Sequence, residues 1–463
     1  MFKTLLFCVF SACWLSSCQK LPNPNANARL FFSADSISFD TIFTSTGTIT
    51  QQIKLINNNP DGIGISQIRL MGGTNSSFII NIDGKPGPNA SNLYIGGTDS
   101  LHIFITVFIK PGAEPRAFIL EDSILVQYNG INQYIQLRAW GQNAHFLKNQ
   151  VIEGNTKWSN DLPYVIYGSL RVDSNAALTI EPGTHIYIHA DAPFFVDGTL
   201  NVLGGSADSL RVYFSGDRTD LPYSGYPGSW PGIHFRITSR DNLLNYAVFQ
   251  NSYQTLITEG PGMGLKPKLS LNQCIINNSL REGILAIRSS ISAINCLFSN
   301  CGQNIVIGLG GTYKFEHCTV ASYSTYQISH AQPVLSVSNS GSLGSQIFTS
   351  DLNARFINCI FWGSDGIQDE ALISKQGNTV FQVLFDHSIL KQQNYPPNID
   401  SSFLWLNTNP RFLATGNPGN AFNFQLGAGS PAVDLGANLG VLIDLQGDPR
   451  PVNQPDLGCY ERQ

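Results

Sequence analysis

The sequence predicts an all-β protein in which a β-sandwich is followed by a solenoid of stacked coils. Three observations support this fold class. Short segments with alternating apolar residues, separated by clusters of Asn, Gly, Asp and Pro, run from Leu30 to about Gln142. Farther on, a short motif returns at an interval of 22 residues, with cysteines at Cys274, Cys296 and Cys318. The composition, with 43 Gly, 11% aromatic and 13% charged residues, is typical of a β-rich exported protein.

The N-terminus has the pattern of a secretory signal. Lys3 precedes an apolar run over residues 5–15, which is too short to span a bilayer. The run leads into the sequence Leu-Ser-Ser-Cys, which ends at Cys18 and resembles the lipobox of bacterial lipoproteins. The resemblance implies that residues 1–17 are removed and that Cys18 carries a lipid anchor. Ordinary cleavage that leaves a free thiol is the alternative.

The stretch after the expected anchor predicts a flexible tether. Residues 18–29 contain Pro, Asn and Ala without apolar periodicity. Gln19 is not acidic, and by analogy with lipoprotein sorting this favours the outer membrane over the inner one. We therefore expect a protein that is held at the outer membrane by lipid and faces the periplasm or the cell surface.

Residues 30–143 are predicted to form the β-sandwich. About seven short strands over roughly one hundred residues fit an immunoglobulin-like fold. The order of the segments also resembles the immunoglobulin-like modules that precede β-helices in lipoproteins of the Bacteroidetes. The matching segments are SFDTIFTSTGT (38–48), LINNNPDGI (55–63) and RAWGQNA (138–144). The resemblance implies a module and not a reaction.

Residues 144–412 are predicted to form the solenoid, because a fixed period near 22 residues means that each coil buries its apolar face only against its neighbours. Several segments resemble the opening coils of right-handed parallel β-helices of the pectin-lyase-like superfamily: LTIEPGT (178–184), VDGTLNVLGG (196–205) and WPGI (230–233). Three irregular stretches are too long for simple turns, and we expect them to leave one face as loops. They span residues 217–229, 259–268 and 322–349.

Residues 413–463 are predicted to cap the solenoid, because the exposed edge of its last strand must be covered. The segment resembles, along its length and in order, the ending of the bacterial β-helix proteins called choice-of-anchor Q. The matching sequences include AVDLG (432–436), DLQGDPRP (444–451) and DLGCYE (456–461). The chain departs from that pattern at Cys459, where the family usually has Ala.

The recurring cysteines invite a metal or redox interpretation, but their spacing favours another one. Ligand cysteines normally come in close pairs, and only Cys296 and Cys301 are near each other. A separation of one coil places successive thiols in a column that points the same way, which suits a disulfide poorly. We expect Cys274, Cys296, Cys318 and Cys359 to form an inward stack of small apolar residues.

Carboxylates are the candidates for catalysis. The resemblance to pectin-lyase-like proteins implies that an enzyme of this kind would cleave polysaccharides with clustered carboxylates, aided by Ca²⁺ or acting as acid and base. The weak candidates are Asp217, Asp220, Asp365 and Asp369, none of which belongs to a compact motif, and solvated turn residues are the favoured interpretation. A Ca²⁺ site in the C-terminal segment is an alternative to having no metal or cofactor. It would use Asp434, Asp444, Asp448 and Asp456.

Loop aromatics are the candidates for binding. Aromatic rings that project from a rigid rod can stack on sugar faces, while Asn and Asp bind hydroxyl groups. Packing of the rings onto the rod is an equal alternative. The residues are Tyr223, Tyr226, Tyr323, Tyr326 and Trp362.

Composition and motifs reduce the number of function classes that the sequence supports. A formal net charge of -5 lacks the basic field that nucleic acid binding needs, and the chain has no Ser-His-Asp signature, phosphate loop or dinucleotide fingerprint. A non-catalytic lipoprotein that binds a polysaccharide or an envelope protein, as an adhesin or scaffold, is the favoured function. A pectin-lyase-like polysaccharide lyase or glycoside hydrolase is the alternative. Acidic residues that converge beside Arg or Lys on one face of the solenoid would favour the enzyme.

Overall fold

The computed structural model describes residues 27–43, 50–109, 118–262, 266–344, 346–364, 366–416 and 422–463. The expected signal, Cys18 and Asp365 lie outside these residues. The described chain is all-β and divides into two compact units between Gln142 and Asn143. Its helices are three-residue 3₁₀ turns, η1 (Gly73–Asn75), η2 (Asp208–Leu210) and η3 (Tyr223–Gly225), and no helix in the described part is long and apolar enough to cross a bilayer.

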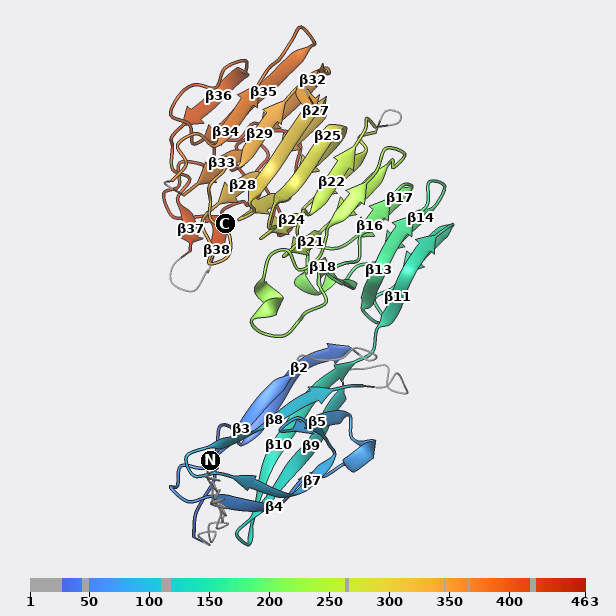
Figure 1. The fold of residues 1–463 in the computed structure, drawn as a ribbon. Coiled ribbons are helices and arrows are strands. Elements are labelled where there is room, and N and C mark those ends of the chain that lie inside the picture. Colours follow the sequence, from blue (N-terminus) through green and yellow to red (C-terminus); the bar gives the residue numbers. More distant parts are fainter. Residues whose placement is uncertain are drawn as a thin grey trace, which may run out of the picture. The chain divides into compact units, whose positions relative to one another are not determined.

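The N-terminal unit consists of two five-stranded sheets (Figure 1). The strands pair antiparallel, except that β2 runs parallel to β10. One sheet has the order β1 (Phe31–Phe32), β3 (Gln51–Ile56), β8 (Ser100–Val107), β5 (Phe78–Ile82), β6 (Lys85–Pro86). The other has the order β2 (Ser36–Phe43), β10 (Ile131–Gln142), β9 (Phe118–Tyr128), β4 (Ile63–Leu70), β7 (Asn89–Ile95).

A single core joins these two sheets. Ile53 and Ile103 of the first sheet and Ile124 and Ile135 of the second are fully buried in one apolar cluster. Along β8 the residues alternate between the core and the outer surface, because successive side chains of a strand point to opposite faces. The alternating segments of the sequence therefore form the inner faces of a two-layer sandwich.

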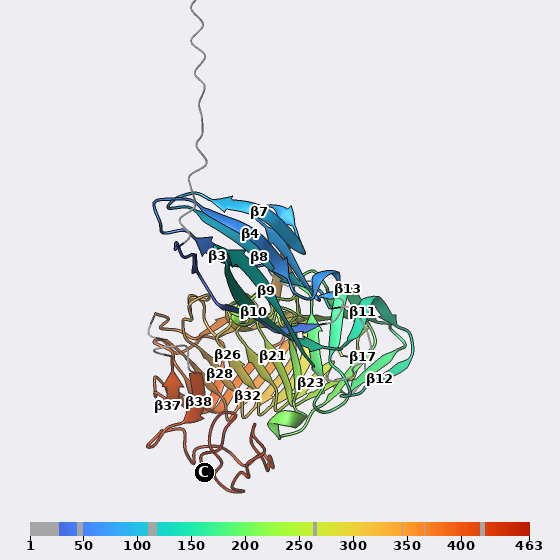
Figure 2. The same cartoon turned by 90° about the horizontal axis from the view of Figure 1, so that it is seen from below.

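The second unit contains a parallel sheet of 24 strands that are stacked in three columns (Figure 1; Figure 2). Column 1 contains β16 (Phe194–Val196), β19 (Ile233–Phe235), β22 (Leu256–Glu259), β29 (Leu335–Ser338) and β34 (Ala371–Ser374). Column 2 contains β12 (Asn155–Trp158), β14 (Ala177–Ile180), β17 (Thr199–Leu203), β20 (Asn242–Asn245), β23 (Leu269–Asn272) and β32 (Leu352–Ile357). Column 3 contains β15 (His185–Ile188), β18 (Val212–Gly216), β21 (Ala247–Gln250), β24 (Ile275–Asn277), β26 (Leu297–Ser299), β28 (Thr319–Ser322) and β33 (Ile360–Gly363).

Six longer strands bend from one column into the next. They are β11 (His145–Ile152), β13 (Tyr164–Val172), β25 (Glu282–Ile294), β27 (Gln303–Glu316), β35 (Phe381–Leu390) and β36 (Asp400–Leu406). Two antiparallel hairpins lie outside the columns: β30 (Ser340–Leu343) with β31 (Gln346–Thr349), and β37 (Phe412–Thr415) with β38 (Phe422–Leu426). Each strand of a column pairs in parallel with the equivalent strand of the next coil, an arrangement consistent with a β-helix.

The cysteine column is confirmed. Cys274, Cys296, Cys318 and Cys359 are fully buried free thiols, and each precedes a strand of column 3 that pairs with the next one along the stack. Ser388 occupies the following position. Each residue of the column follows a residue with a positive φ, such as Gln273 or Asn295, at which the chain turns sharply into column 3. Small side chains fit inside this turn.

The long irregular stretches leave the columns at two corners and not at one face. Residues 217–229 and 323–334 connect column 3 to column 1, whereas residues 260–268 connect column 1 to column 2. The expected loop 322–349 is not a single loop, because it contains β29 of column 1 and the hairpin β30–β31. The alternating Leu-Ser-Val-Ser sequence of β29 buries Leu335 and Val337 and is a coil strand.

The C-terminal segment lies along the side of the coils, whereas a cover for the last strand was expected. Its backbone is held by side chains from separate coils: Arg211 Nη2 donates to Leu445 O (2.7 Å), Asn295 Nδ2 to Ile443 O (2.7 Å) and Asn358 Nδ2 to Ala437 O (2.8 Å). The last strand, β36, pairs with β35 alone. The irregular segment follows the corner between columns 2 and 3 because polar side chains there satisfy its carbonyl groups.

Candidate functional site

An open groove lies on the outer face of column 3. Its floor comes from β18, β21, β24 and β26, and its walls come from the connections 217–229 and 323–334 and from the C-terminal segment. It has two adjoining parts, with volumes of about 430 and 420 Å³, that share Gln250, Asn277 and Phe422. We call the part beside Asn251 and Asn278 the amide half and the part beside Tyr213 and Tyr460 the aromatic half.

Polar side chains cross the floor of the groove at the same place in successive coils. In the parallel register Gln250 pairs with Asn277, and Asn277 pairs with Ser299. Ser299 Oγ donates to Asn277 Oδ1 at 3.0 Å. Neighbouring parallel strands are about 4.8 Å apart, so these side chains form a ladder that follows the direction of stacking.

A second ladder lies in the turns at the end of the floor. Asn251, Asn278 and Asn300 all have positive φ values, a conformation that Asn tolerates better than most residues. Asn251 Nδ2 donates to Ser224 O (2.7 Å), and Asn278 Nδ2 donates to Gly225 O (3.1 Å) and to Asn251 Oδ1 (2.7 Å). The turn asparagines therefore fix the loop that forms one wall.

The same ladder has one acceptor without a donor. Both hydrogen bonds of the Asn278 amide use Nδ2, and its Oδ1 is a buried atom with no hydrogen-bond partner. Asn300 Oδ1, by contrast, accepts the backbone N–H of Tyr323 at 3.0 Å. A buried acceptor without a donor carries a desolvation cost, and its burial keeps it out of reach of a ligand in the groove.

Aromatic side chains surround the other half of the groove. Phe422 and Phe424 of β38 are stacked with ring centroids 6.1 Å apart, and Tyr213 and Tyr460 contribute phenol rings. Burial, followed by a hydrogen bond to Asp208, raises the pKa of Tyr213 to about 12. Burial also raises the pKa of Tyr460, so both phenols keep their protons at neutral pH.

The few charged residues in the groove have polar partners. Asp208 accepts a hydrogen bond from the Tyr213 hydroxyl. Arg211 is only 7% exposed and donates to Leu445 O (2.7 Å) and to Gln273 O (3.4 Å). The aromatic half therefore has one lining group of each sign, and the lining of the amide half has no charged group among the described residues.

Three of the five predicted binding aromatics lie beside the groove. The rings of Tyr223 and Tyr226 are 5.5 Å apart and about 40% exposed, and the residues between them, Ser224 and Gly225, line the groove. Tyr326 is 81% exposed and lies between two lining residues of the opposite wall.

The other two predicted aromatics pack against the C-terminal segment, with Trp362 buried and Tyr323 half-buried. Tyr323 lies under the C-terminal hairpin, with its ring 6.4 Å from Phe422 and 6.2 Å from Phe424. Trp362 is 8% exposed and belongs to an apolar cluster beneath the C-terminal segment. Its ring is not available to stack on a ligand, because the C-terminal segment covers it.

Each described catalytic candidate has a hydrogen-bond partner of its own. Asp217 Oδ2 pairs with His189 Nδ1 at 2.7 Å. Asp220 accepts two hydrogen bonds from Arg218 (2.7 and 2.9 Å), and the Arg218 guanidinium lowers the pKa of Asp220. Asp369 Oδ1 accepts the backbone N–H of Gln393 at 2.7 Å, an arrangement that fits a loop residue. Asp365 lies outside the described residues.

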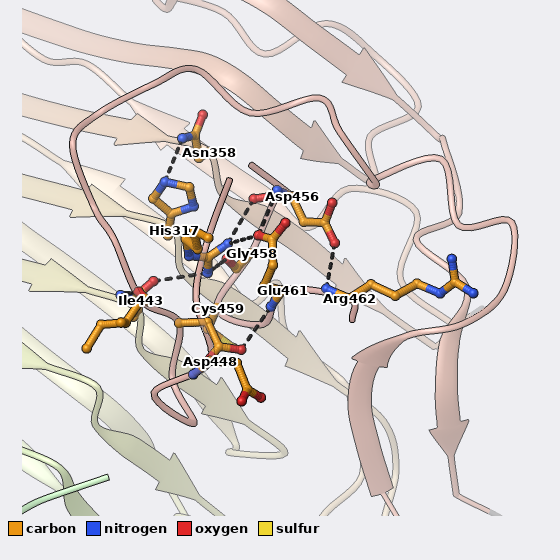
Figure 3. A network of polar contacts seen from close by, with 12 residues as sticks. His317, Asn358, Ile443, Asp448, Asp456, Gly458, Cys459, Glu461 and Arg462 are labelled. Atoms are coloured by element: carbon orange, nitrogen blue, oxygen red, sulfur yellow. Dashed lines mark hydrogen bonds and ion pairs between the residues drawn. The ribbon is translucent and has the colours of Figure 1, made fainter. Parts of the chain in front are cut away.

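The aspartates of the C-terminal segment bind backbone amides. Asp444 accepts the N–H groups of Gln446, Asp448 and Glu461 at 2.8–2.9 Å, and Asp456 accepts those of Asp434 and Arg462 at 2.8 Å (Figure 3). These bonds hold the turns of the segment in place. Across the described ranges, no three His, Cys, Asp or Glu side chains gather as a metal site.

A buried ion pair lies within the same segment, and its arginine also binds a coil residue, Asn295. Arg450 Nη1 donates to Glu461 Oε2 (2.8 Å), and Nη2 donates to Asn295 Oδ1 (3.0 Å) and Gly458 O (2.8 Å). The side chains of Arg450 and Glu461 are 0% and 5% exposed. Burial raises the pKa of Glu461 to about 7 and lowers the pKa of Arg450, and the charge of each opposes the shift of the other.

Charged residues also gather on the outer face of column 1, at positions that sequence reasoning did not select. Arg236 forms two hydrogen bonds with Asp197, and Arg171 Nη1 lies 3.9 Å from Asp197 Oδ2. His234 Nε2 lies 3.2 Å from Glu259 Oε1 in the next coil. The parallel register of Arg171, Phe195 and His234 could have revealed the group.

Comparisons with known proteins find no family. No family model and no curated protein matches the chain. Solved structures that it resembles include a family 123 glycoside hydrolase from Clostridium perfringens, with 13% identity over 27% of this chain and 26% of that one and a TM-score of 0.20. A PapD-like domain of human CEP192 matches with 11% identity over 29% of this chain and 97% of that one, at a TM-score of 0.18. This chain spans about a quarter of the hydrolase chain, and likeness at this level carries no functional argument.

Proposed function

We propose that this protein is an outer-membrane lipoprotein, anchored through Cys18, that binds a glycan without cleaving it. The groove on column 3 carries the proposal, because it combines a ladder of amide side chains with aromatic walls and has no unpaired carboxylate in its described lining. Amides and hydroxyls bind sugar hydroxyl groups, and aromatic rings pack on the apolar faces of sugars.

We also propose which known folds the two units adopt. We assign the sandwich as immunoglobulin-like and the columns as a right-handed parallel β-helix with a choice-of-anchor Q type ending. The two-sheet core and the three columns of parallel strands support these assignments. A rigid stack of this kind presents the groove side chains at fixed intervals, which lowers the entropic cost of binding an extended ligand.

The second candidate function is that of a polysaccharide lyase or glycoside hydrolase. Asp197 between Arg171 and Arg236 is the observation that favours it, because an acidic group beside arginines on a solenoid face is suited to acid–base chemistry. The two-point hydrogen bond between Asp197 and Arg236 argues against it, since both groups are already engaged.

One experiment distinguishes these functions. The lipid-free chain from Gln19 onward is incubated with a panel of neutral and acidic polysaccharides, with and without Ca²⁺, and both retention and product formation are recorded. We expect retention without products. New unsaturated or reducing ends that disappear in an Asp197→Asn variant would establish the enzyme instead, and neither retention nor products would point to a protein partner.

The groove variant Gln250→Ala tests the place of binding. Gln250 is exposed, and its backbone oxygen, which accepts from Trp230 Nε1 at 2.7 Å, is retained in the variant. Asn353→Ala is the matched control, because Asn353 is an exposed amide residue of β32 in column 2. Retention should fall with the first variant and not with the second.

A further inference from the structure

The spacing of the groove ladder constrains how a ligand lies. Gln250, Asn277 and Ser299 occupy equivalent positions of β21, β24 and β26, so they succeed one another along the stack at about 4.8 Å. This distance is close to the length of one pyranose unit in an extended chain. A linear glycan that runs along the stack therefore meets the Gln250 and Asn277 side chains at successive sugars, while Ser299, 2% exposed, supports Asn277 through its hydrogen bond.

The polar groups that line the groove indicate which chemical groups of a ligand it can bind. The described polar lining of the amide half consists of amides, hydroxyls and backbone groups, which pair with hydroxyl groups both as donors and as acceptors. A sugar hydroxyl group is a donor, whereas an ionised carboxylate or sulfate group only accepts. The exposed Gln250 amide offers both donors and an acceptor to a neighbouring sugar.

The charge of the groove supports the same conclusion. An acidic glycan carries one negative charge per repeat, and proteins bind such charges with Arg or Lys. The only cation that lines the two halves is Arg211, which already donates to two backbone carbonyls and is matched by Asp208 in the same lining. No field attracts a polyanion along the described lining.

From these observations we infer that the groove binds a linear, uncharged glycan that lies along the stacking direction with one sugar per coil. Three successive sugars contact the coils of Gln250, Asn277 and Ser299. This inference rests on the proposed glycan-binding function and adds the charge class, the orientation and the number of sugars.

The test is calorimetric titration of the full chain, purified in detergent, with defined oligosaccharides. The probes are cello-, xylo- and manno-oligosaccharides of one to six residues, together with oligouronates of the same lengths. We expect affinity for at least one neutral series to rise up to three or four sugars and then to level off. We also expect that raising the salt concentration leaves this affinity unchanged, because screening acts only on charges.

Two variants locate the contacts. Gln250→Ala and Asn277→Ala should each weaken binding of the neutral trisaccharide by about three- to tenfold, the effect of losing one hydrogen bond. Asn353→Ala is the control and should leave the affinity unchanged. Thermal melting of each variant verifies that the fold is intact.

Each other outcome has a distinct meaning. Tighter binding of oligouronates, weakening by salt, or a plateau at a single sugar would overturn the inference while glycan binding itself stands. If neither neutral nor acidic glycans bind at any length, the proposed function fails together with the inference.

Discussion

Gly363, the last residue of β33, is closely surrounded by buried polar side chains. A Cβ atom at this position would lie 2.1 Å from Glu370 Oε1 and 2.4 Å from His330 Nε2. These two atoms are 2.9 Å apart in an ion pair whose side chains are 0% and 1% exposed. We expect Gly363→Ala to lower the free energy of unfolding by about 1–3 kcal/mol, because neither partner can move into solvent. Urea unfolding measures this loss.

Gly366 is the matched control for that variant. It lies three residues farther on, in the connection that follows β33, and a Cβ atom added there would meet nothing within 4 Å. Gly366→Ala should change stability by less than about 0.5 kcal/mol. Equal effects of the two substitutions would show that the ion pair does not restrict this position.

Lys268 gives the protein a pH dependence with a defined sign. Its side chain is buried, and Nζ donates to Arg236 O and Ile237 O, both at 3.0 Å, and to Glu259 O. Burial lowers its pKa from 10.5 to about 8, although Glu259 opposes this shift. The unfolded chain then binds more protons than the folded chain between pH 8 and 10.5, so the stability that Lys268 contributes is present above this window and is lost as pH falls through about 8.

The measurement compares the protein with a Lys268→Met variant. The difference in unfolding free energy, protein minus variant, should grow in favour of the protein as pH rises from 8 to 10.5. The same comparison with Lys266→Met, at an exposed position, should show no such trend. A constant difference at Lys268 would mean that this group binds the same number of protons in the folded and unfolded chains across the range.

Residue exposure was the least predictable feature of the candidate site. Tyr326 and Trp362 are both aromatic residues in or beside connections, yet one is 81% and the other 8% exposed. The difference arises because residues beyond 422 fold back over Trp362, and no local pattern encodes that contact. The groove was missed for the same reason, since its three walls and its floor are far apart in the sequence.

At the scale of elements, the cysteine column explains how the protein protects its thiols from oxidation. Cys274, Cys296 and Cys318 are fully buried, and burial raises the pKa of each thiol. Because the thiolate is the reactive form, we expect no alkylation by iodoacetamide at pH 8 in the folded protein and complete alkylation in urea. Mass spectrometry of the peptides tests this. Labelling of any of the three without urea would contradict the burial of the column.

The columns themselves could be predicted because their pattern is local. A 22-residue interval between cysteines shows which residues of successive coils are equivalent, so a structure predicted for one coil applies to the others. The path of the C-terminal segment could not be predicted in this way. Its hydrogen bonds join residues 234, 148 and 79 positions apart, and each depends on one polar side chain that happens to face a free carbonyl group.

The buried pair Arg450–Glu461 stabilises the fold of that segment, and Arg450 also binds the coils through Asn295. Arg450→Met leaves the Glu461 carboxylate buried without its cation, and we expect it to lower the free energy of unfolding by about 3–5 kcal/mol. Limited proteolysis should then cut the variant within residues 436–463 before the coils. Arg462→Met, at an exposed neighbouring position, is the control and should resemble the unaltered protein.

At the scale of the whole molecule, the sandwich and the coils have separate apolar cores, so each unit contains the packing that it needs. The described surface of the second unit presents its groove side chains from a stack in which every coil supports the next. Such a scaffold suits binding at a membrane surface, because its groove side chains are already held in place before a ligand arrives. The function proposed here therefore depends on the anchor as much as on the groove.

Cys18 is the residue on which that anchoring depends. The several acyl chains of a bacterial lipoprotein hold a protein stably at a membrane, whereas a single chain holds it only marginally. We expect the full chain, expressed in a bacterial host, to sediment with membranes and to incorporate labelled palmitate. Cys18→Ser should move it to the soluble fraction without label, while Cys13→Ser, within the signal, should change neither result. Membrane association that survives Cys18→Ser without label would show that another segment holds the protein, and the orientation of the groove would then have to be derived from that segment.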